Sequence, residues 1–169
     1  MAARNKSANP PAAARAALTR ELFGRGMPHA MGVRLVSFTR KKVVAEMPIK
    51  PMHLNRSGRV NGGALMAFAD ILGAMGTIIN LPPGHHTTTL ESKTNFFAAG
   101  DGVAVTGVSI PLHLGRTTMV WQTTIKNSDG RRVAIVTQTQ IVIPAKAHAA
   151  PAPVKAAPAK AKRRLRAKK

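Results

Sequence analysis

The sequence predicts an α+β fold, in which an antiparallel sheet of about six strands is wrapped around one long central helix. Residues 62–81 form a long stretch rich in Ala, Leu, Met and Ile, with the composition of a helix that is apolar on nearly every side. Six other segments alternate or are rich in β-branched residues, and short breaks containing Gly, Asn or Pro separate them. A single helix this apolar needs a sheet around it.

The elements before the long helix are short. Residues 13–23 suit a helix that Gly24 ends. Residues 33–39 and 42–49 have the pattern of two strands, and residues 55–58 have turn composition. The chain therefore reaches its long helix after one small helix and two strands.

Four strands are expected after the long helix, which Pro82, Pro83 and Gly84 end. They cover roughly residues 86–97, 102–113, 116–127 and 131–143. The breaks between them are short, of the kind that joins hairpins, so we expect consecutive strands to pair antiparallel across Ala99–Gly102, Gly115 and Asn127–Gly130. The sheet keeps unpaired edges, so we expect a homodimer that forms through an edge.

Three zones differ in composition. Residues 1–12 are polar and contain prolines, and we expect them to be disordered. Residues 13–144 have the composition of a single globular domain, and residues 145–169 form an Ala/Pro/Lys/Arg-rich tail. That tail has nine basic residues, no acidic one and too little apolar surface to fold. It is expected to be a disordered accessory feature, which either contacts nucleic acid or another anionic surface without sequence preference or serves solubility alone.

The overall charge is strongly positive, with 26 basic and 6 acidic residues. This imbalance favours partners that carry phosphate, nucleic acid or anionic lipid. There is no cysteine, which excludes disulfides, thiolate nucleophiles and cysteine-based zinc sites. The six histidines show no metal-binding spacing, so no metal site is expected. The N-terminal segment lacks the apolar core of a secretory signal, which favours a cytoplasmic location, with an organellar transit peptide as the alternative.

Asp70 is the only charged residue between Arg59 and Glu91, and it lies in the middle of the long apolar helix. A carboxylate in apolar surroundings is costly unless it is paired or hydrogen-bonded. It can be a structural group held by a basic partner, or it can act as a general base or nucleophile toward a carbonyl carbon. The apolar stretch 62–81 is nearly as long as a transmembrane helix. Asp70 at its centre and the strands that follow favour a soluble core helix instead.

The long helix begins with Asn61-Gly62-Gly63. Asn61 is a good N-cap, and the free N–H groups of a helix N-terminus can hold a developing oxyanion. A capped, tightly packed helix start is the alternative. Asp70 follows Gly62 by eight residues, about 12 Å along the helix axis. That separation is too long for one subunit to present both groups to one carbonyl, so we hypothesise that antiparallel helices from two subunits bring them together.

Two segments resemble one known family. Asn55-Arg56-Ser57-Gly58-Arg59-Val60-Asn61-Gly62-Gly63, continued to Asp70, resembles the N-x-x-G-x-x-H-G-G-x-x-x-x-x-x-D signature of PaaI-like (phenylacetic acid degradation type) hotdog thioesterases. Residues 89–97, TLESKTNFF, resemble the strand that follows it. The resemblance covers roughly residues 20–143, and the motifs occur in order at the right spacing.

The resemblance implies hydrolysis of acyl-CoA thioesters without a metal or an organic cofactor. It implies that Asp70 activates water or attacks the carbonyl, and that Asn55 orients the water or the thioester. The backbone N–H of Gly62 would polarise the thioester C=O, and Thr89 would help to position water. It also implies a site shared across a dimer interface, in a dimer or in a tetramer built of two dimers.

One residue departs from the family pattern, because Asn61 replaces the histidine of H-G-G. Asn donates a hydrogen bond but carries no proton at neutral pH. With Gly63 and Arg116, Asn61 is a candidate for substrate binding, and Arg116 suits a phosphate of coenzyme A. The alternative function is a non-catalytic hotdog module that binds CoA derivatives, or nucleic acid through its tail. A hotdog hydratase is a further alternative, but its motif with a catalytic His is absent. Acyl preference stays open.

Overall fold

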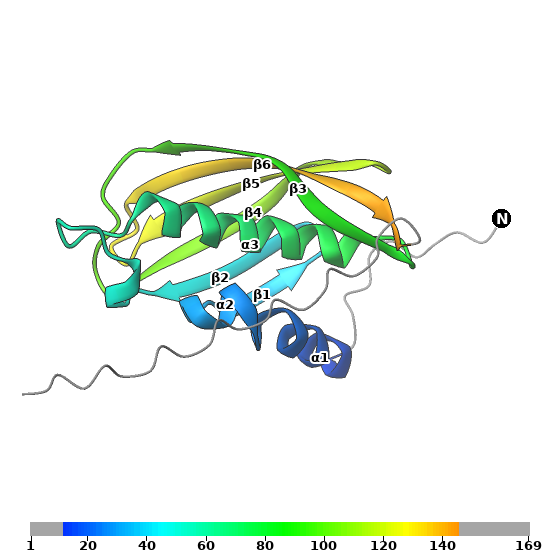
Figure 1. Cartoon of the computed structure of the whole chain (residues 1–169), viewed down its shortest axis with the longest axis horizontal. Coiled ribbons are helices and arrows are strands. Elements are labelled where there is room, and N and C mark those ends of the chain that lie inside the picture. The colour runs from blue at the N-terminus through cyan, green and yellow to red at the C-terminus, as the bar shows by residue number, and fades with distance from the viewer. Residues whose placement is uncertain (1–11, 146–169) are drawn as a thin grey trace, which may run out of the picture.

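The computed structural model describes residues 12–145 and shows one sheet that curves around one long helix (Figure 1). The sheet has six strands in the order β1-β2-β4-β5-β6-β3, and every neighbouring pair is antiparallel. The strands are β1 Arg34–Thr39, β2 Lys42–Pro48, β3 His85–Phe96, β4 Ala104–Leu114, β5 Thr118–Asn127 and β6 Arg132–Pro144. The predicted α+β class and strand number are confirmed.

The long helix, α3, covers Gly62–Asn80 and lies along the concave face of the sheet (Figure 1). The other helical segments are α1 (Ala12–Phe23), α2 (Gly26–Met31) and the short 3-10 turn η1 (Pro51–His53). At the end of α3, the Asn80 side chain donates to the carbonyls of Gly76 and Arg40, so the helix stops against the β1–β2 turn.

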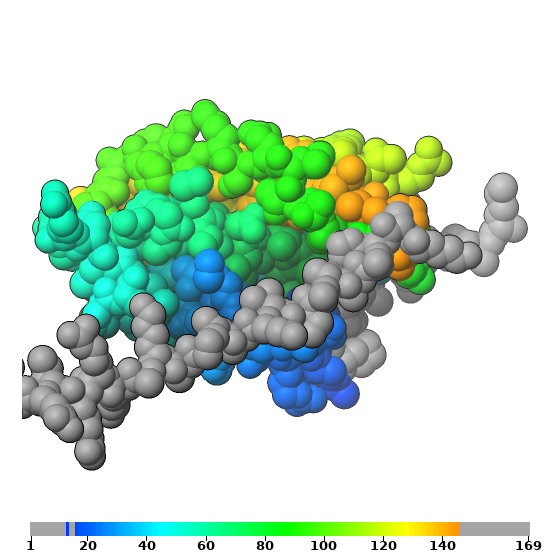
Figure 2. Space-filling view, viewed as in Figure 1, coloured from blue at the N-terminus to red at the C-terminus, as the bar shows by residue number. Residues whose placement is uncertain are grey.

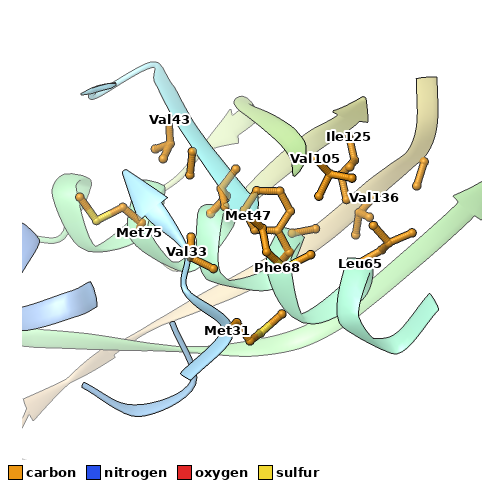
Figure 3. Packing of buried hydrophobic residues seen from close by; sticks show 14 of the residues in the cluster. Met31, Val33, Val43, Met47, Leu65, Phe68, Met75, Val105, Ile125 and Val136 are labelled. Carbon is orange, nitrogen blue, oxygen red and sulfur yellow. The ribbon is translucent and has the colours of Figure 1, made fainter. Parts of the chain in front are cut away.

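The contact between α3 and the sheet is close. A Cβ atom on Gly107 of β4 would lie 2.7 Å from Leu72 and 2.8 Å from Phe68, so only glycine admits these two side chains. Phe68 and Leu72 are fully buried, and Figure 3 shows Phe68 surrounded by side chains of the sheet. The core between helix and sheet is therefore packed to contact.

The predicted hairpin at Ala99–Gly102 is wrong. β3 does not pair with β4 but lies at the far edge of the sheet beside β6, with Thr89 opposite Gln140. The chain then crosses to the middle of the sheet, and Gly100 forms a bridge with Val60 on the way. The glycines correctly mark where the chain bends. They do not decide the pairing partner, because β4 is needed between β2 and β5 to close the sheet around α3.

The short helix α2 was not predicted. It ends at Gly32, whose φ of 70° lies in the left-handed region that favours glycine. Together α1 and α2 lie below α3 in the view of Figure 1, on the side away from β3. In the space-filling view, the surface of α3 is visible between these helices and β3 (Figure 2).

One side of α3 is incompletely covered. Met66 is 37% exposed, and the other residues of this side are half-buried: Gly62, Ala67, Asp70, Ile71, Ala74 and Ile78. The helix is long and apolar enough to cross a membrane, yet its other side forms the core of the sheet. Although the sequence of α3 is apolar on nearly every side, only its sheet-facing half is fully buried.

The chain ends add two details. α1 begins at Ala12, one residue before the predicted start of the domain. Ala145 closes the described part, and its N–H donates to the carbonyl of Gly84. The remainder of the two segments predicted to be disordered, 1–11 and 146–169, lies outside the described residues.

Candidate active site

Asp70 lies in the middle of α3, on the incompletely covered side. It is half-buried and forms part of the wall of a pocket between α3 and the two N-terminal helices. The other residues of the wall are apolar: Leu22 and Phe23 from α1, Pro28 from α2, and Ile71, Ala74, Met75 and Ile78 from α3. The carboxylate is thus the single charged group of an apolar pocket.

Two side chains donate hydrogen bonds to one oxygen of this carboxylate. Thr89 Oγ1 donates to Asp70 Oδ1 over 2.8 Å, and Gln138 Nε2 donates to the same atom over 3.2 Å. Gln138 Nε2 also lies 3.2 Å from the main-chain carbonyl of Asp70. None of the ion pairs found within residues 12–145 involves Asp70, so the structural alternative of a basic partner has no support there.

A second glutamine lies behind Thr89. Gln140 Nε2 donates to Thr89 Oγ1 over 2.8 Å, and Thr87 Oγ1 lies 3.1 Å from Gln140 Oε1. Thr89 is followed by a β-bulge, a feature that often redirects a side chain next to a functional site. Thr89 therefore stands between Asp70 and Gln140 in one hydrogen-bonded series.

The N-terminus of α3 is capped as predicted. Asn61 Oδ1 accepts the N–H of Gly63 over 2.8 Å, so the Gly63 N–H is already engaged. The N–H groups of Ala64 and Leu65 go to the carbonyl of Asn61. The Gly62 N–H has no acceptor among residues 12–145 and remains available to a ligand.

Asn55 organises the turn before α3. Its Oδ1 accepts from the N–H of Ser57, the hydroxyl of Ser57 and the N–H of Arg59, over 2.9, 2.8 and 3.1 Å. The side chain is exposed, and its Nδ2 donor has no partner among the described residues. The carbonyl oxygen of Asn55 is thus used for the turn, while its amide NH₂ is free for a substrate.

Arg116 lies at the end of the molecule opposite to the Asn55–Gly63 segment. It is exposed in the turn between β4 and β5, and that hairpin projects beyond the C-terminal half of α3 (Figure 1). Trp121 of the same hairpin packs against Gly76, 14 residues after Gly62. Within one chain, Arg116 and the Asn55–Gly63 segment are therefore at opposite ends of α3.

The candidate residues therefore form two groups in one chain. Asp70 and Thr89 are in direct contact, whereas Asn55, Asn61, Gly62 and Gly63 lie about two helical turns away. The sequence-based reasoning missed Gln138 and Gln140. A signal existed, because Val136, Gln138, Gln140 and Val142 alternate on β6 and share its buried face. Two polar residues on a buried face need partners.

His53 lies under the start of α3 and is fully buried. Its Nδ1 accepts the N–H of Lys50 over 3.1 Å, and its carbonyl accepts the N–H of Asn61 over 2.7 Å. Burial, together with the nearby charge of Lys50, lowers the pKa of His53 below its usual 6.5. His53 is thus a support for the loop before α3, held in its neutral form.

Residues 12–145 contain no group of three or more His, Asp or Glu side chains arranged to hold a metal ion. The polar groups around the pocket are the carboxylate of Asp70, hydroxyls and side-chain amides. Such a set suits proton transfer and hydrogen bonding to a carbonyl compound.

Known proteins resemble this chain in sequence. A sequence profile of the thioesterase superfamily matches residues 57–134. A protein of Deinococcus radiodurans that is assigned as an esterase is 32% identical over 125 residues, which cover 71% of this chain and 78% of that protein.

Solved structures share the fold. A mutant thioesterase of Pseudomonas aeruginosa superposes with a TM-score of 0.73 at 25% identity, over 83% of this chain and 99% of that chain. A hypothetical thioesterase of Streptococcus pneumoniae, solved with coenzyme A, gives a TM-score of 0.66 at 26% identity, over 75% of this chain and 97% of that chain. The residues matched by the sequence profile include α3 and the strands β3, β4 and β5.

Proposed function

Since this chain is a hotdog-fold member of the thioesterase superfamily, and so a thioester hydrolase, we propose that its substrates are fatty or aryl acyl-CoA thioesters. The observation that carries this proposal is the position of Asp70, a lone carboxylate on the wall of an apolar pocket. An acyl group in the pocket would bring its thioester carbonyl toward that carboxylate. The coenzyme A in the Streptococcus pneumoniae structure supports coenzyme A as the thiol component.

In the proposed reaction, Asp70 acts as general base or as nucleophile. As a base, it takes a proton from water while the water oxygen bonds to the thioester carbon. The tetrahedral intermediate then collapses, the C–S bond breaks, and the thiolate of coenzyme A receives the proton that Asp70 holds. As a nucleophile, Asp70 forms a mixed anhydride with release of coenzyme A, and water then hydrolyses the anhydride.

The developing oxyanion needs a donor, and the free N–H of Gly62 at the start of α3 is the proposed one. Because Gly62 and Asp70 lie eight residues apart on one helix, we propose that each site combines Gly62 of one subunit with Asp70 of another. The half-buried apolar side of α3 and the free edge of β3 are the surfaces that such a homodimer would use.

The remaining candidates receive narrower roles. The Thr89 hydroxyl donates to Asp70, so we propose that it holds the carboxylate in place. The Asn55 amide NH₂ would orient the thioester, and Asn61 and Gly63 would shape the helix start that receives it. Arg116 of a neighbouring subunit suits a phosphate of coenzyme A. No cofactor is required in this proposal, and a cytoplasmic location stays a prediction.

The test is an assay of thiol release from acyl-CoA esters of increasing chain length, together with phenylacetyl- and benzoyl-CoA. We expect Asp70→Asn to lower kcat by about 10²- to 10⁴-fold, because the base or nucleophile is lost. Asp129→Asn is the matched control, since Asp129 lies in the exposed β5–β6 turn. Equal activity in Asp70→Asn and wild type would contradict the assignment. Binding of coenzyme A without hydrolysis of any ester would favour a non-catalytic module.

A further inference from the structure

β6 places two buried glutamines behind the carboxylate of Asp70. Gln138 and Gln140 are both fully buried, and both point from the concave face of the sheet toward α3. Gln138 contacts Asp70 directly, whereas Gln140 contacts it through Thr89, its partner across the β3–β6 pair. Neither belongs to the motif that carries the family resemblance.

The position of Gln138 is associated with two features that reduce the stability of the fold. Its Oε1 is buried without a hydrogen-bond partner among the described residues, which is unfavourable for a polar atom. Its amide also lies so close to α3 that a Cβ atom at Gly73 would overlap it. Glycine in the middle of a helix is itself unfavourable. Two unfavourable features thus combine to keep one N–H donor on Asp70.

Gln140 decides where the Thr89 hydroxyl points. Gln140 Nε2 lies 2.8 Å from Thr89 Oγ1 and donates to it, while the single proton of the Thr87 hydroxyl has two acceptors, the Ile141 carbonyl at 2.8 Å and Gln140 Oε1 at 3.1 Å. A hydroxyl that accepts from Gln140 keeps its own proton for another acceptor. That acceptor is Asp70 Oδ1, 2.8 Å away. The orientation of one amide therefore sets the direction of the whole series.

We propose that Gln138 and Gln140 are positioning residues that direct both hydrogen bonds to Oδ1, and so leave Oδ2 of Asp70 as the reacting oxygen. The inference rests on the proposed function, because it assigns a task within that site. Two hydrogen bonds to one oxygen restrict the rotation of the carboxylate, so the other oxygen stays available at the pocket wall. Such alignment lowers the barrier of a reaction without strengthening substrate binding.

The kinetic test uses Gln138→Met, which keeps the approximate shape and removes the amide. We expect kcat to fall roughly ten- to a hundredfold with KM nearly unchanged, because a misplaced reacting group loses alignment. Tm should change little, because the loss of two hydrogen bonds to Asp70 and the removal of an unpartnered buried oxygen have opposite effects on stability. Gln140→Met should lower kcat in the same way but by less, because Thr89 is still able to donate to Asp70. Thr139→Val, on the opposite face of β6, is the matched control.

A second variant displaces the Gln138 amide by a substitution on α3. Gly73→Ala should push Gln138 away from Asp70 and reproduce the kinetic effect of Gln138→Met. Wild-type kcat in Gln138→Met would overturn the proposal. So would a loss of activity that parallels a loss of Tm, because the glutamine would then be structural only.

An infrared measurement separates this inference from the proposed function. The difference spectrum between wild type and Asp70→Asn isolates the two carboxylate stretches of Asp70, and their separation widens when one oxygen carries the hydrogen bonds. We expect the separation to shrink in Gln138→Met, whether or not any ester is hydrolysed. An unchanged separation would overturn the inference. Absence of wild-type hydrolysis, with the expected spectral change, would contradict only the proposed function.

Discussion

At the scale of single residues, Asn61 accounts for most of the N–H groups at the start of α3. Asn61 uses its side chain to cap Gly63, and its carbonyl receives the next two N–H groups. This leaves one backbone donor, the N–H of Gly62, pointing out of the helix. A Cβ atom at position 62 would lie 3.1 Å from the ring of Phe96, so glycine also sets the local packing.

Two substitutions of Gly62, to proline and to alanine, distinguish the role of its N–H group from the role of its small size in packing. Gly62→Pro removes the donor at the first helical position, where proline is well tolerated, and Asn61 already has the extended backbone that precedes proline. If Gly62 holds the oxyanion, kcat should fall by about 10²- to 10³-fold in thiol-release assays.

Gly62→Ala is the control for that measurement. It adds the same Cβ contact with Phe96 but keeps the N–H, so its kcat should stay close to that of wild type. Equal losses in the two variants would show that space, and not hydrogen bonding, is what Gly62 provides.

At the scale of elements, the segment before α3 is held by His53. Its imidazole accepts the N–H of Lys50 and its carbonyl accepts the N–H of Asn61, so η1 is tied to the cap of the long helix. Protonation of Nδ1 would remove the first of these bonds. The neutral form of His53 is therefore part of the structure that positions Gly62.

Stability should consequently fall in mild acid. The pKa of His53 is lowered in the folded state, so below about 6.5 the unfolded chain binds a proton that the folded chain resists. The free energy of unfolding then decreases as pH falls from 6.5 through the folded-state pKa. Chemical denaturation at several pH values between 7.5 and 5 should show a smaller decrease for His53→Gln than for wild type. Parallel curves for the two proteins would exclude His53 as the source.

The sheet covers only one side of α3. The strands cover the face that contains Phe68 and Leu72, while Met66, Ile71 and Ala74 remain partly accessible. β3 ends the sheet with a free edge, and Leu90, Phe96 and Phe97 on it or just after it are more than half exposed. Apolar surface and an open edge lie next to one another, which is the arrangement expected of an interface.

At the scale of the whole molecule, the proposed site requires two chains, and mixing two inactive variants tests this. Asp70→Asn and Gly62→Pro each disable both sites of a homodimer. A mixed dimer has one site with wild-type Gly62 and Asp70. After joint refolding of equal amounts, about a quarter of wild-type activity should return if the subunits are related by a twofold axis.

Sites contained within one chain would give the opposite result. No activity would return upon mixing, because every chain would carry a defect in its own site. Refolding each variant alone provides the baseline, and mixing without refolding shows how fast subunits exchange.

The described residues include only some of the basic side chains that give the chain its positive charge. Arg59 and Arg131 both pair with Asp101, which fixes two of the basic side chains at the end of the molecule near the start of α3. The predicted contacts of the basic tail with nucleic acid or another anionic surface concern residues outside the described part, and they stay a prediction.

Much of the fold was predictable because the signals are local. Turn residues such as Gly130 and Gly84 end elements through their own backbone preferences, and alternation or helical periodicity is visible within one segment. Asp70 stood out for the same reason, as one charge in an apolar helix. The sequence by itself thus determined the six strands, the central helix and the candidate reacting group.

Only the tertiary structure decided which distant segments meet. The position of β3 beside β6, and not beside β4, brings Thr89 opposite Gln140 and places Gln138 against α3. The choice depends on long-range pairing and on closing the sheet around the helix, and no window of sequence contains both partners. The hydrogen bonds that hold Asp70 span 19 and 68 positions of the chain, so they exist only once the fold has formed.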